Sequence, residues 1–286
     1  MTQEKEKDED WDLVLTPKNK MLWLDIKEIV QYKDLLFLLI RRDFVSVYKQ
    51  TILGPLWFVF QPIVSTIMYM FVFGSIAKMG TDGIPQPLFY FTGNMLWTFF
   101  SNTLTKCQDT FNANAGLFGK VYFPRFTMPI SYTVNSFFTF LIQFAFLIIF
   151  YMFYLVSGTA VTPTWWIFLT PVLILQTALL GMGIGILISA LTTKYRDLRQ
   201  LVSFGLGIFM YVTPVVYPLS NVPAQWAPFF YLNPMTPVFE MFRYAFLGKG
   251  MHNIWMWSAS LVATLLIFWL GVVTFNHNEK TFIDVI

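Results

Sequence analysis

The sequence predicts an all-α polytopic membrane protein with six transmembrane helices. Two features of its composition carry this prediction. Of its 286 residues, 56% are hydrophobic and 12% are charged, whereas a soluble domain carries about 25% charged residues. Several apolar runs also reach the roughly 20 residues that a helix needs to cross a bilayer. The chain has too little polar surface to cover itself in water.

The N-terminal segment, residues 1–31, is expected to be a cytoplasmic tail. Its first dozen residues are acidic and lack the apolar core of a signal peptide, and blocks of like charge favour a solvated tail. Residues 20–34 alternate apolar and charged side chains, which fits either a strand or an interfacial helix. In residues 32–50 the apolar side chains fall in one arc at helical spacing, with basic residues outside it. This pattern is typical of an amphipathic helix in the membrane interface, either as a plain anchor or as a substrate gate.

The apolar runs that follow form the predicted transmembrane domain, residues 51–286. Gly54 and Pro55 precede the first run, and polar or Gly- and Pro-containing loops separate the others. The second run contains Asn94 and Asn102, whose amides are expected to face other helices rather than lipid. The predicted crossings are residues 56–77, 87–105, 126–156, 165–191, 200–217 and 254–275.

Glycines recur in the fourth and fifth crossings. Small residues let membrane helices approach closely, so we interpret these glycines as packing residues. They are Gly181, Gly183, Gly185, Gly205 and Gly207.

One further apolar segment, residues 222–248, is not expected to cross the membrane. Prolines interrupt it, and it contains Glu240 and Arg243. An unpaired charge at the bilayer centre costs about 2.5–3.5 kcal/mol, and broken backbone is tolerated at membrane depth only inside protein or beside water. We predict two short helices that enter from the outer face and return, with Glu240 and Arg243 paired on one helix face.

The distribution of Lys and Arg predicts the orientation. With six crossings and both termini in the cytoplasm, sixteen of the nineteen basic residues lie on the cytoplasmic side, which is the side that basic residues favour. We therefore expect a multi-pass protein of the cytoplasmic (inner) membrane. This topology also places residues 112–122 in the cytoplasm, where we expect a short helix between two crossings.

The sequence lacks the motifs of a catalyst. Its nearest approach to a phosphate-binding loop, residues 116–121, lacks the required spacing and the Ser or Thr. The two histidines, His252 and His277, lie at opposite ends of the last crossing, and the single Cys107 excludes an internal disulfide. The crossings contain no chain of acids of the kind that ion-driven transport uses. We expect a transport subunit without a metal or cofactor of its own, driven by energy from another protein.

Aromatic residues make up 19% of the chain. Many of them are explained by interfacial belts and core packing. Others are candidates for a sugar path, because the C–H faces of sugars pack on aromatic rings, and Trp and Tyr add a hydrogen-bonding tip. The residues selected for such a glycan path are Trp57, Phe60, Tyr69, Tyr211 and Tyr217.

Several segments resemble, in order, the type-2 ABC exporter permeases for polysaccharides, which include the Wzm-like O-antigen permeases and their teichoic-acid and capsule relatives. The first is residues 41–62, RRDFVSVYKQTILGPLWFVFQP, which resembles the entry to the family's first crossing. It departs from the family at Val47, where an arginine often stands before the tyrosine. The later matching segments are residues 123–125 (Phe-Pro-Arg), 194–198 (Lys-Tyr-Arg-Asp-Leu), 213–218 (Thr-Pro-Val-Val-Tyr-Pro) and 233–235 (Asn-Pro-Met).

The resemblance implies partners and a mechanism. Two copies of the chain would form a channel, and each would engage a separate ATPase subunit that holds ATP and Mg²⁺. The substrate would be a glycan linked to a polyprenyl pyrophosphate, such as O-antigen, and no nucleic acid is expected as a partner.

The resemblance also implies roles for individual residues. A coupling helix would contact the ATPase, with two of its side chains, Leu117 and Phe118, inserted into a groove of that subunit. The residues of this coupling site are Leu117, Phe118, Lys120 and Val121. Those implied for the lipid pyrophosphate are Arg41, Arg42 and Lys49, and those for the outer gate are Asn233, Glu240 and Arg243.

Two alternatives differ in substrate or in class. A permease of this type could carry a teichoic acid, a capsule glycan or another amphipathic substrate. A membrane-bound glycan-modifying acyltransferase would need a catalytic His or acid at the membrane face, and neither histidine has a fitting partner in the sequence.

Overall fold

The computed structural model describes residues 26–49, 52, 54–158, 161–192 and 197–282, and its regular elements are all helical. Most of the expected N-terminal tail therefore lies outside the described residues. In chain order the elements are α1 (Ile26–Gln31), α2 (Lys33–Tyr48), η1 (Gly54–Leu56), α3 (Trp57–Tyr69), η2 (Met70–Ile76), α4 (Gln86–Gln108), α5 (Thr110–Ala113), α6 (Ala115–Phe118), α7 (Thr127–Val156), η3 (Trp165–Leu169), α8 (Thr170–Thr192), α9 (Leu198–Val212), η4 (Leu219–Asn221), α10 (Ala227–Leu232), α11 (Met235–Leu247) and α12 (Ile254–Phe282).

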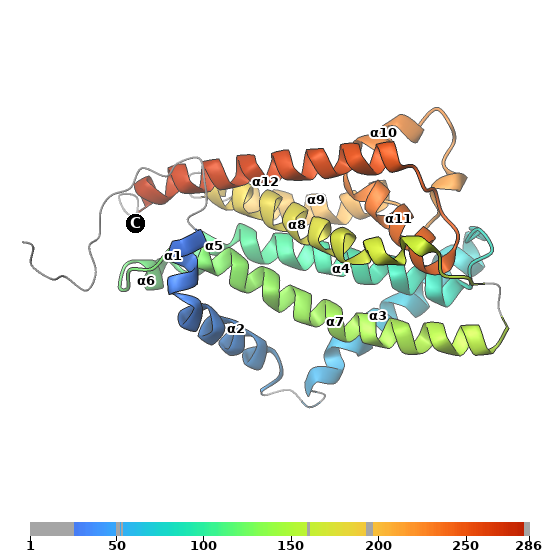
Figure 1. The fold of residues 1–286 in the computed structure, drawn as a ribbon, viewed down its shortest axis with the longest axis horizontal. Helices are drawn as coiled ribbons and strands as arrows, with labels where there is room; N and C mark the ends of the chain where they lie inside the picture. Colours follow the sequence, from blue (N-terminus) through green and yellow to red (C-terminus); the bar gives the residue numbers. More distant parts are fainter. Residues whose placement is uncertain (1–25, 50–51, 53, 159–160, 193–196, 283–286) are drawn as a thin grey trace, which may run out of the picture.

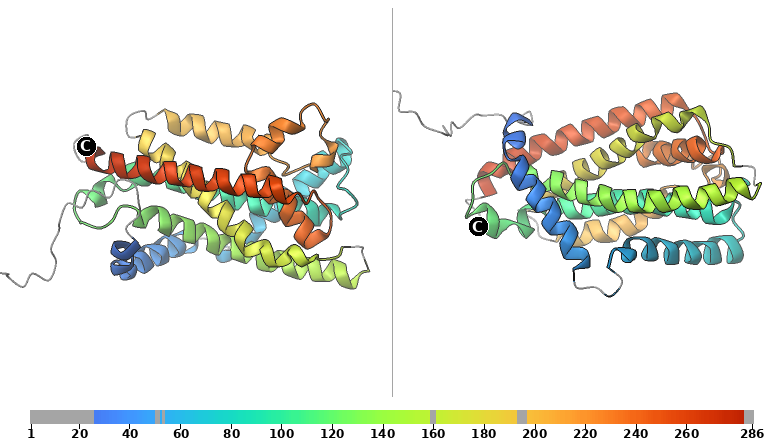
Figure 2. Two further views of the ribbon diagram at one scale, coloured as in Figure 1. Left: turned by 45° about the horizontal axis from the view of Figure 1, so that its top comes forward. Right: turned by 60° about the horizontal axis from the view of Figure 1, so that its bottom comes forward.

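The long helices run side by side in one bundle (Figure 1). α8 packs between α4 and α12, and α7 packs on α4. The short helices α5 and α6 lie at one end of the bundle, together with α1 and the end of α12, while α10 and α11 lie toward the other end. α2 packs on α7 but runs obliquely to the long helices (Figure 2).

Four helical segments of the described residues are long and apolar enough to cross a membrane. They are Gly54–Ile76, Thr127–Val156, Trp165–Thr192 and Ile254–Asn278. These segments match the first, third, fourth and last predicted crossings, and they confirm a multi-pass helical protein. α4 has 23 residues but carries polar side chains, and α9 has only 15 residues, fewer than the roughly 20 needed to span a bilayer. The count of six crossings stays a prediction.

The fifth predicted crossing, residues 200–217, is shorter in the structure than in the sequence analysis. α9 ends at Val212, and Thr213 has an extended backbone with φ −104° and ψ 138°. Pro214 follows, and the residue before a proline is disfavoured in the α conformation. The apolar run continues to Tyr217, but the proline ends the helix, so the predicted boundary was wrong.

The single helix expected over residues 112–122 is replaced by two single turns, α5 and α6. They meet at Asn114, whose Nδ2 donates to the carbonyl of Thr110 at 2.8 Å and to Tyr132 Oη at 2.8 Å. Asn side chains compete for backbone groups in this way, and Gly116 and Gly119 further lower the helix propensity. The segment is therefore a compact folded loop rather than a rigid helix.

The alternation over residues 20–34 resolves as helix in its described part. α1 ends at Gln31, and α2 begins directly after Tyr32. Residues 20–25 lie outside the described residues. α2 buries Leu39 against the bundle and leaves Phe37 and Leu38 exposed, as expected for an amphipathic helix at a membrane surface.

The packing glycines divide into two groups. A Cβ added at Gly181 would lie 3.0 Å from the Phe100 carbonyl oxygen, and one at Gly183 would lie 2.8 Å from Phe268 Cα. Gly185 is also tightly packed, so the close approach of α8 to α4 and α12 is confirmed. A Cβ added at Gly205 or Gly207 on α9 would meet no atom of another element within 4 Å among the described residues, and the packing interpretation was wrong for them within this subunit.

Candidate functional site

A cavity of about 440 Å³ lies among α2, α3, α4, α7 and α9. Each of three helices presents a stripe of side chains to it at a spacing of four residues, and residues four apart lie on one helix face. The stripes are Trp57, Gln61, Ser65 and Tyr69 on α3, Asn94, Thr98, Asn102 and Lys106 on α4, and Asn135, Thr139 and Gln143 on α7. Asp43 and Phe44 complete the wall on α2, and Met210 completes it on α9.

Two of the carboxamides hold the wall together. Pro62 lies inside α3 and has no N–H, so it removes the helical partner of the Phe58 carbonyl four residues earlier. Gln143 Nε2 donates to that carbonyl at 3.1 Å, and Asn94 Nδ2 donates to the Pro62 carbonyl at 3.3 Å. The proline thus creates a polar site that links α3 to α7.

The side-chain amide of Asn135 is free to form hydrogen bonds with a bound molecule. Its side chain is 3% exposed, and neither of its amide atoms has a hydrogen-bond partner among the described residues. Oε1 of Gln143 is also buried and has no hydrogen-bond partner among the described residues. A buried polar group without a partner costs about 1–3 kcal/mol, so these atoms favour a polar molecule inside the cavity.

The structure brings together two of the five predicted glycan-path residues. Trp57 and Tyr69 line the cavity, and Tyr69 Oη contacts Met210 Sδ at 3.7 Å. Phe60 and Tyr211 are exposed and do not line it. Tyr217 lines a separate hollow of about 400 Å³ and donates a hydrogen bond to the Tyr211 carbonyl.

The carboxamides that dominate the cavity were missed as site residues. The sequence predicts only contacts between helices for Asn94 and Asn102. The spacing of four that recurs in three separate apolar runs was the available signal. It indicates a polar face on each helix, although it does not say which faces meet.

The basic residues implied for the lipid pyrophosphate lie on and just after α2. Arg41 and Lys49 are exposed. Arg42 forms an ion pair with Asp43 at 2.7 Å, and Asp43 lines the cavity. The basic face of α2 is thus continuous with one wall of the cavity.

The folded loop of α5 and α6 is anchored from inside. Phe118 is 8% exposed, and its ring centroid lies 5.6 Å from that of Phe123 and 6.3 Å from that of Phe111. The expectation that Phe118 inserts into a partner's groove is therefore wrong, because its ring already fills an internal cluster. Leu117 is half-buried, whereas Lys120 is exposed and Val121 is 52% exposed.

This loop is fastened to the helices behind it. The Phe111 ring stacks on Phe275 of α12 at 4.5 Å, and the Phe111 N–H donates to Ser189 Oγ of α8 at 3.3 Å. Asp109 pairs with Arg199 at the start of α9 at 2.6 Å. A displacement of the loop would therefore be transmitted to α8, α9 and α12.

At the other end, Arg243 organises a buried network. Its Nη1 donates to the Pro214 carbonyl at 2.6 Å, and its Nη2 donates to the Val215 carbonyl at 2.7 Å. Glu240 lies 3.6 Å away on the same helix face, as the sequence predicted, and the guanidinium lies 3.8 Å from the centroid of the Phe89 ring. These bonds attach α11 to the chain just after α9.

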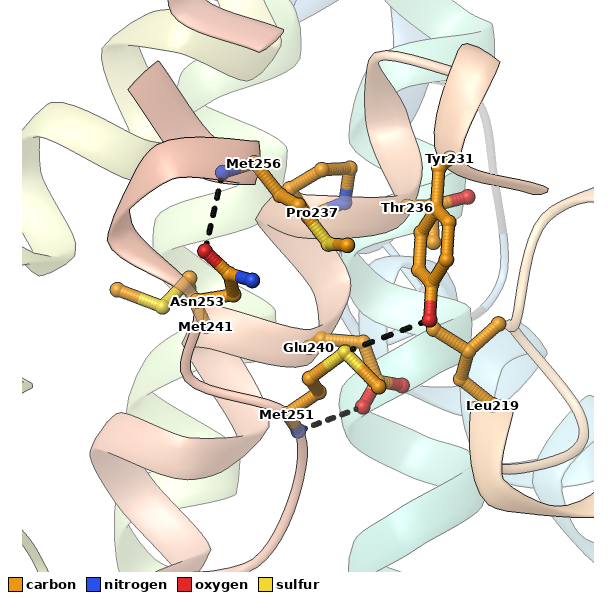
Figure 3. A pocket seen from close by; sticks show the side chains of 9 residues that line it. All are labelled: Leu219, Tyr231, Thr236, Pro237, Glu240, Met241, Met251, Asn253 and Met256. Carbon is orange, nitrogen blue, oxygen red and sulfur yellow. Dashed lines mark hydrogen bonds between the residues drawn. The ribbon is translucent and has the colours of Figure 1, made fainter. Parts of the chain in front are cut away.

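Asn233 and Glu240 extend the same network. Asn233 Nδ2 donates to Thr213 Oγ1 at 2.8 Å, and its Oδ1 accepts the Met235 N–H at 2.9 Å. Figure 3 shows Glu240 accepting the Met251 N–H, at 2.9 Å, beside a very small pocket of about 10 Å³. The three residues implied for an outer gate therefore belong to one set of contacts around α10 and α11.

Comparison with known proteins gives a consistent assignment. The family model of the ABC-2 type transporter matches residues 34–247. The "O-antigen export system permease protein RfbA" of Myxococcus xanthus is 25% identical over 262 residues, covering 91% of this chain and 98% of that protein. The protein of the same name from Klebsiella pneumoniae is 26% identical over 255 residues, covering 88% of this chain and 95% of that protein. The "Polysialic acid transport protein KpsM" of Escherichia coli is 22% identical over 235 residues, covering 80% and 87% respectively.

The family match spans the helices that form the cavity, the folded loop and the Arg243 network, and it ends before α12. The sequence resemblance to type-2 exporter permeases is thereby confirmed. The chain belongs to the ABC-2 type transporter family, as a helical membrane permease.

Proposed function

We propose that this chain is the membrane subunit that exports a lipid-linked polysaccharide, such as O-antigen, across the cytoplasmic membrane. The cavity carries the proposal, because it combines carboxamides with the indoles of Trp57 and Trp97 inside an otherwise apolar bundle. Carboxamides bond hydroxyl groups in both directions, and indoles offer apolar faces with a polar tip. The relatives named for O-antigen export support the same class of cargo.

The proposal includes six crossings, with the basic end of the bundle in the cytoplasm. α4 and α9 would complete the six, and the assembly would contain two copies of the chain. The exposed apolar face of α9 is the candidate surface for the second copy, since a 15-residue helix is better sheltered by protein than by lipid. Its exposed side chains are Leu201, Phe204, Ile208 and Tyr211.

A separate ATPase subunit, in two copies, would bind ATP and Mg²⁺ and press on the folded loop of α5 and α6. The surface available to it includes Lys120 and Val121, while Phe118 supports the loop from inside. Because Phe111 and Asp109 connect the loop to α8, α9 and α12, such a push would reach the bundle.

Val121→Asp is expected to lower copurification with the ATPase by roughly tenfold, because a charge would be desolvated in an apolar contact. The measurement is the ratio of the two subunits after affinity purification. Trp226→Asp is the matched control, since it places the same charge on an exposed apolar position directly before α10, and α10 lies toward the opposite end of the bundle (Figure 1). Equal loss in both variants, or no loss in the first, would contradict the assignment of the contact.

Arg41, Arg42 and Lys49 are proposed to attract the pyrophosphate of the lipid carrier, because cationic side chains bond phosphate oxygens strongly. The Arg41→Ala, Arg42→Ala double variant is expected to reduce glycan export by roughly tenfold through the loss of these bonds. Surface glycan is measured in cells with equal protein levels. The Lys27→Ala, Lys33→Ala double variant removes two exposed charges from α1 and the start of α2 and should export normally. Unchanged export in the arginine variant would refute the pyrophosphate site.

At the outer end, α10 and α11 are proposed to form a re-entrant pair that closes the mouth of the path. Asn233, Glu240 and Arg243 would set its position through the bonds described above. The proposed gate would open by movement of this pair relative to α9, with the Arg243 network as its attachment.

The complete proposal is tested by purifying the chain with its ATPase subunit and reconstituting both in lipid. ATP hydrolysis should rise when a polyprenyl-pyrophosphate glycan is added, but not with the polyprenyl pyrophosphate alone. Failure to form a complex, or a rate of ATP hydrolysis that does not change when the glycan is added, would contradict the proposal. A teichoic acid or capsule glycan would be identified by the same assay, and the family match favours transport over acyl transfer.

A further inference from the structure

We propose that the cavity selects uncharged sugar residues, so that the exported glycan is neutral along the part that passes it. This inference rests on the proposed function and specifies its substrate class. It follows from the kinds of polar group that line the cavity, from their charge and from the contacts that hold them in place.

The polar lining is dominated by carboxamides. They come from three helices and are Gln61, Asn94, Asn102, Asn135 and Gln143. A carboxamide has both a donor and an acceptor end and no charge. A sugar hydroxyl also donates and accepts, so the two groups pair in either direction without an ion.

The lining offers little charge to a substrate. Among the described residues, Asp43 on α2 and Lys106 on α4 are the charged groups that line the cavity, and Asp43 is already paired with Arg42 at 2.7 Å. An acidic sugar would bring a carboxylate at repeated positions. An ionised group is costly to desolvate unless a cation and hydrogen bonds compensate it, and a wall of carboxamides with one lysine provides little such compensation.

The uncommitted polar atoms lie deep in the cavity. Asn135 is buried, and both of its amide atoms lack a partner among the described residues, as does Oε1 of Gln143. The other end of Gln143 is held on the Phe58 carbonyl, which fixes its orientation. These groups can form hydrogen bonds with hydroxyls, which both donate and accept. A carboxylate only accepts, so the carbonyl oxygen of each carboxamide could not form a hydrogen bond with it.

The apolar part of the cavity is suited to a sugar ring. Trp97 is held between Phe100, at 5.6 Å between ring centroids, and Phe209, at 6.1 Å. Trp57 lines the cavity from α3. Fixed indoles present apolar surface to the C–H face of a sugar at little further cost in conformational freedom. Selectivity for neutral residues then comes from the carboxamides, and weak general affinity for sugars comes from the indoles.

The test measures equilibrium binding of two oligosaccharides of equal length to the full chain in nanodiscs. The probes are maltohexaose, which is neutral, and hexagalacturonate, which is acidic. Maltohexaose should bind roughly tenfold more tightly, because the acidic probe must bury carboxylates without cations. Asn135→Leu should weaken maltohexaose binding by roughly tenfold through the lost hydrogen bonds. Gln31→Leu, which removes an exposed carboxamide at the end of α1 and outside the cavity, should bind as the parent does.

A second variant is expected to reduce the selectivity. Gln61→Lys adds a cation at an exposed position in the lining, and it should raise hexagalacturonate affinity by roughly threefold by providing one ion pair. Equal or tighter binding of hexagalacturonate to the parent chain would overturn the selectivity while leaving polysaccharide export standing. If Asn135→Leu leaves the affinity for maltohexaose unchanged, the assignment of the binding site is overturned. Binding of neither probe would overturn both the selectivity and the role of this cavity, and the reconstituted ATPase assay would then judge the proposed function separately.

Discussion

Arg243→Met is expected to destabilise the protein by about 3–5 kcal/mol, the cost typical of breaking a buried charge pair from one side. Arg243 is 1% exposed and donates to the carbonyls of Pro214 and Val215. Methionine has a similar length but no donor. The two carbonyls would lose these bonds, and Glu240 would keep a buried charge without its cation.

The loss should be visible as a lower unfolding temperature of the purified protein in detergent or nanodiscs. Lys249→Met is the control, because Lys249 is exposed near the end of the same helix, and it should change the unfolding temperature little. Adding Glu240→Gln to Arg243→Met should recover part of the loss, since it removes the unpaired charge. A double variant less stable than Arg243→Met alone would show that Glu240 has another essential partner.

The same network gives Gly93 a defined role. A Cβ at this position would lie 2.3 Å from the Val215 carbonyl oxygen and 2.9 Å from Arg243 Nη2. Only a residue without a side chain lets α4 approach this closely. The attachment of α11 thus depends on a glycine in one helix, an arginine in a second and a proline-ended helix in a third.

Gly185→Ala is expected to destabilise the protein by about 1–3 kcal/mol through overpacking. The added Cβ would lie 2.6 Å from Cys107 Cβ and 2.8 Å from the Leu104 carbonyl oxygen. Both atoms belong to or adjoin the backbone of α4, so no flexible side chain can move aside. α4 and α8 would have to separate, and α4 leads directly into the folded loop of α5.

Gly207→Ala is the matched control for this substitution. Gly207 also lies inside a helix, but no atom of the described chain lies within 4 Å of its added Cβ. Alanine is favoured over glycine inside a helix by about 1 kcal/mol, so this variant should be as stable as the parent or slightly more stable. The measurement is thermal unfolding of both variants in nanodiscs. A Gly185→Ala protein as stable as the control would contradict the close contact of α4 and α8.

Much of the fold could be predicted from local chemistry. The apolar runs predicted α7 and α8 closely, and the prolines and charges of residues 222–248 predicted two short helices where α10 and α11 lie. The pairing of Glu240 with Arg243 followed from their separation of three residues. These features are local, since helix length, helix breaks and neighbours on one helix face follow from the order of residues along a single segment.

The errors arose where a distant contact competes with a local preference. Phe118 looked available to a partner, but Phe111 and Phe123 surround it. The expected coupling helix is divided into α5 and α6 because Asn114 donates a hydrogen bond to Tyr132 on α7. From the sequence, an apolar side chain on a loop is expected to be exposed. Only the packing shows whether such a side chain already has partners inside the protein.

The sequence by itself determined the class of the molecule, its helical segments and its family resemblance, because these depend on composition and on spacing within a segment. The tertiary structure alone decided that the polar stripes of α3, α4 and α7 face one cavity, and that Pro62 is matched by Gln143 from another helix. A spacing of four predicts a polar face on a helix, but the rotation of each helix is set by packing against all its neighbours. The candidate site is therefore a property of how the helices meet.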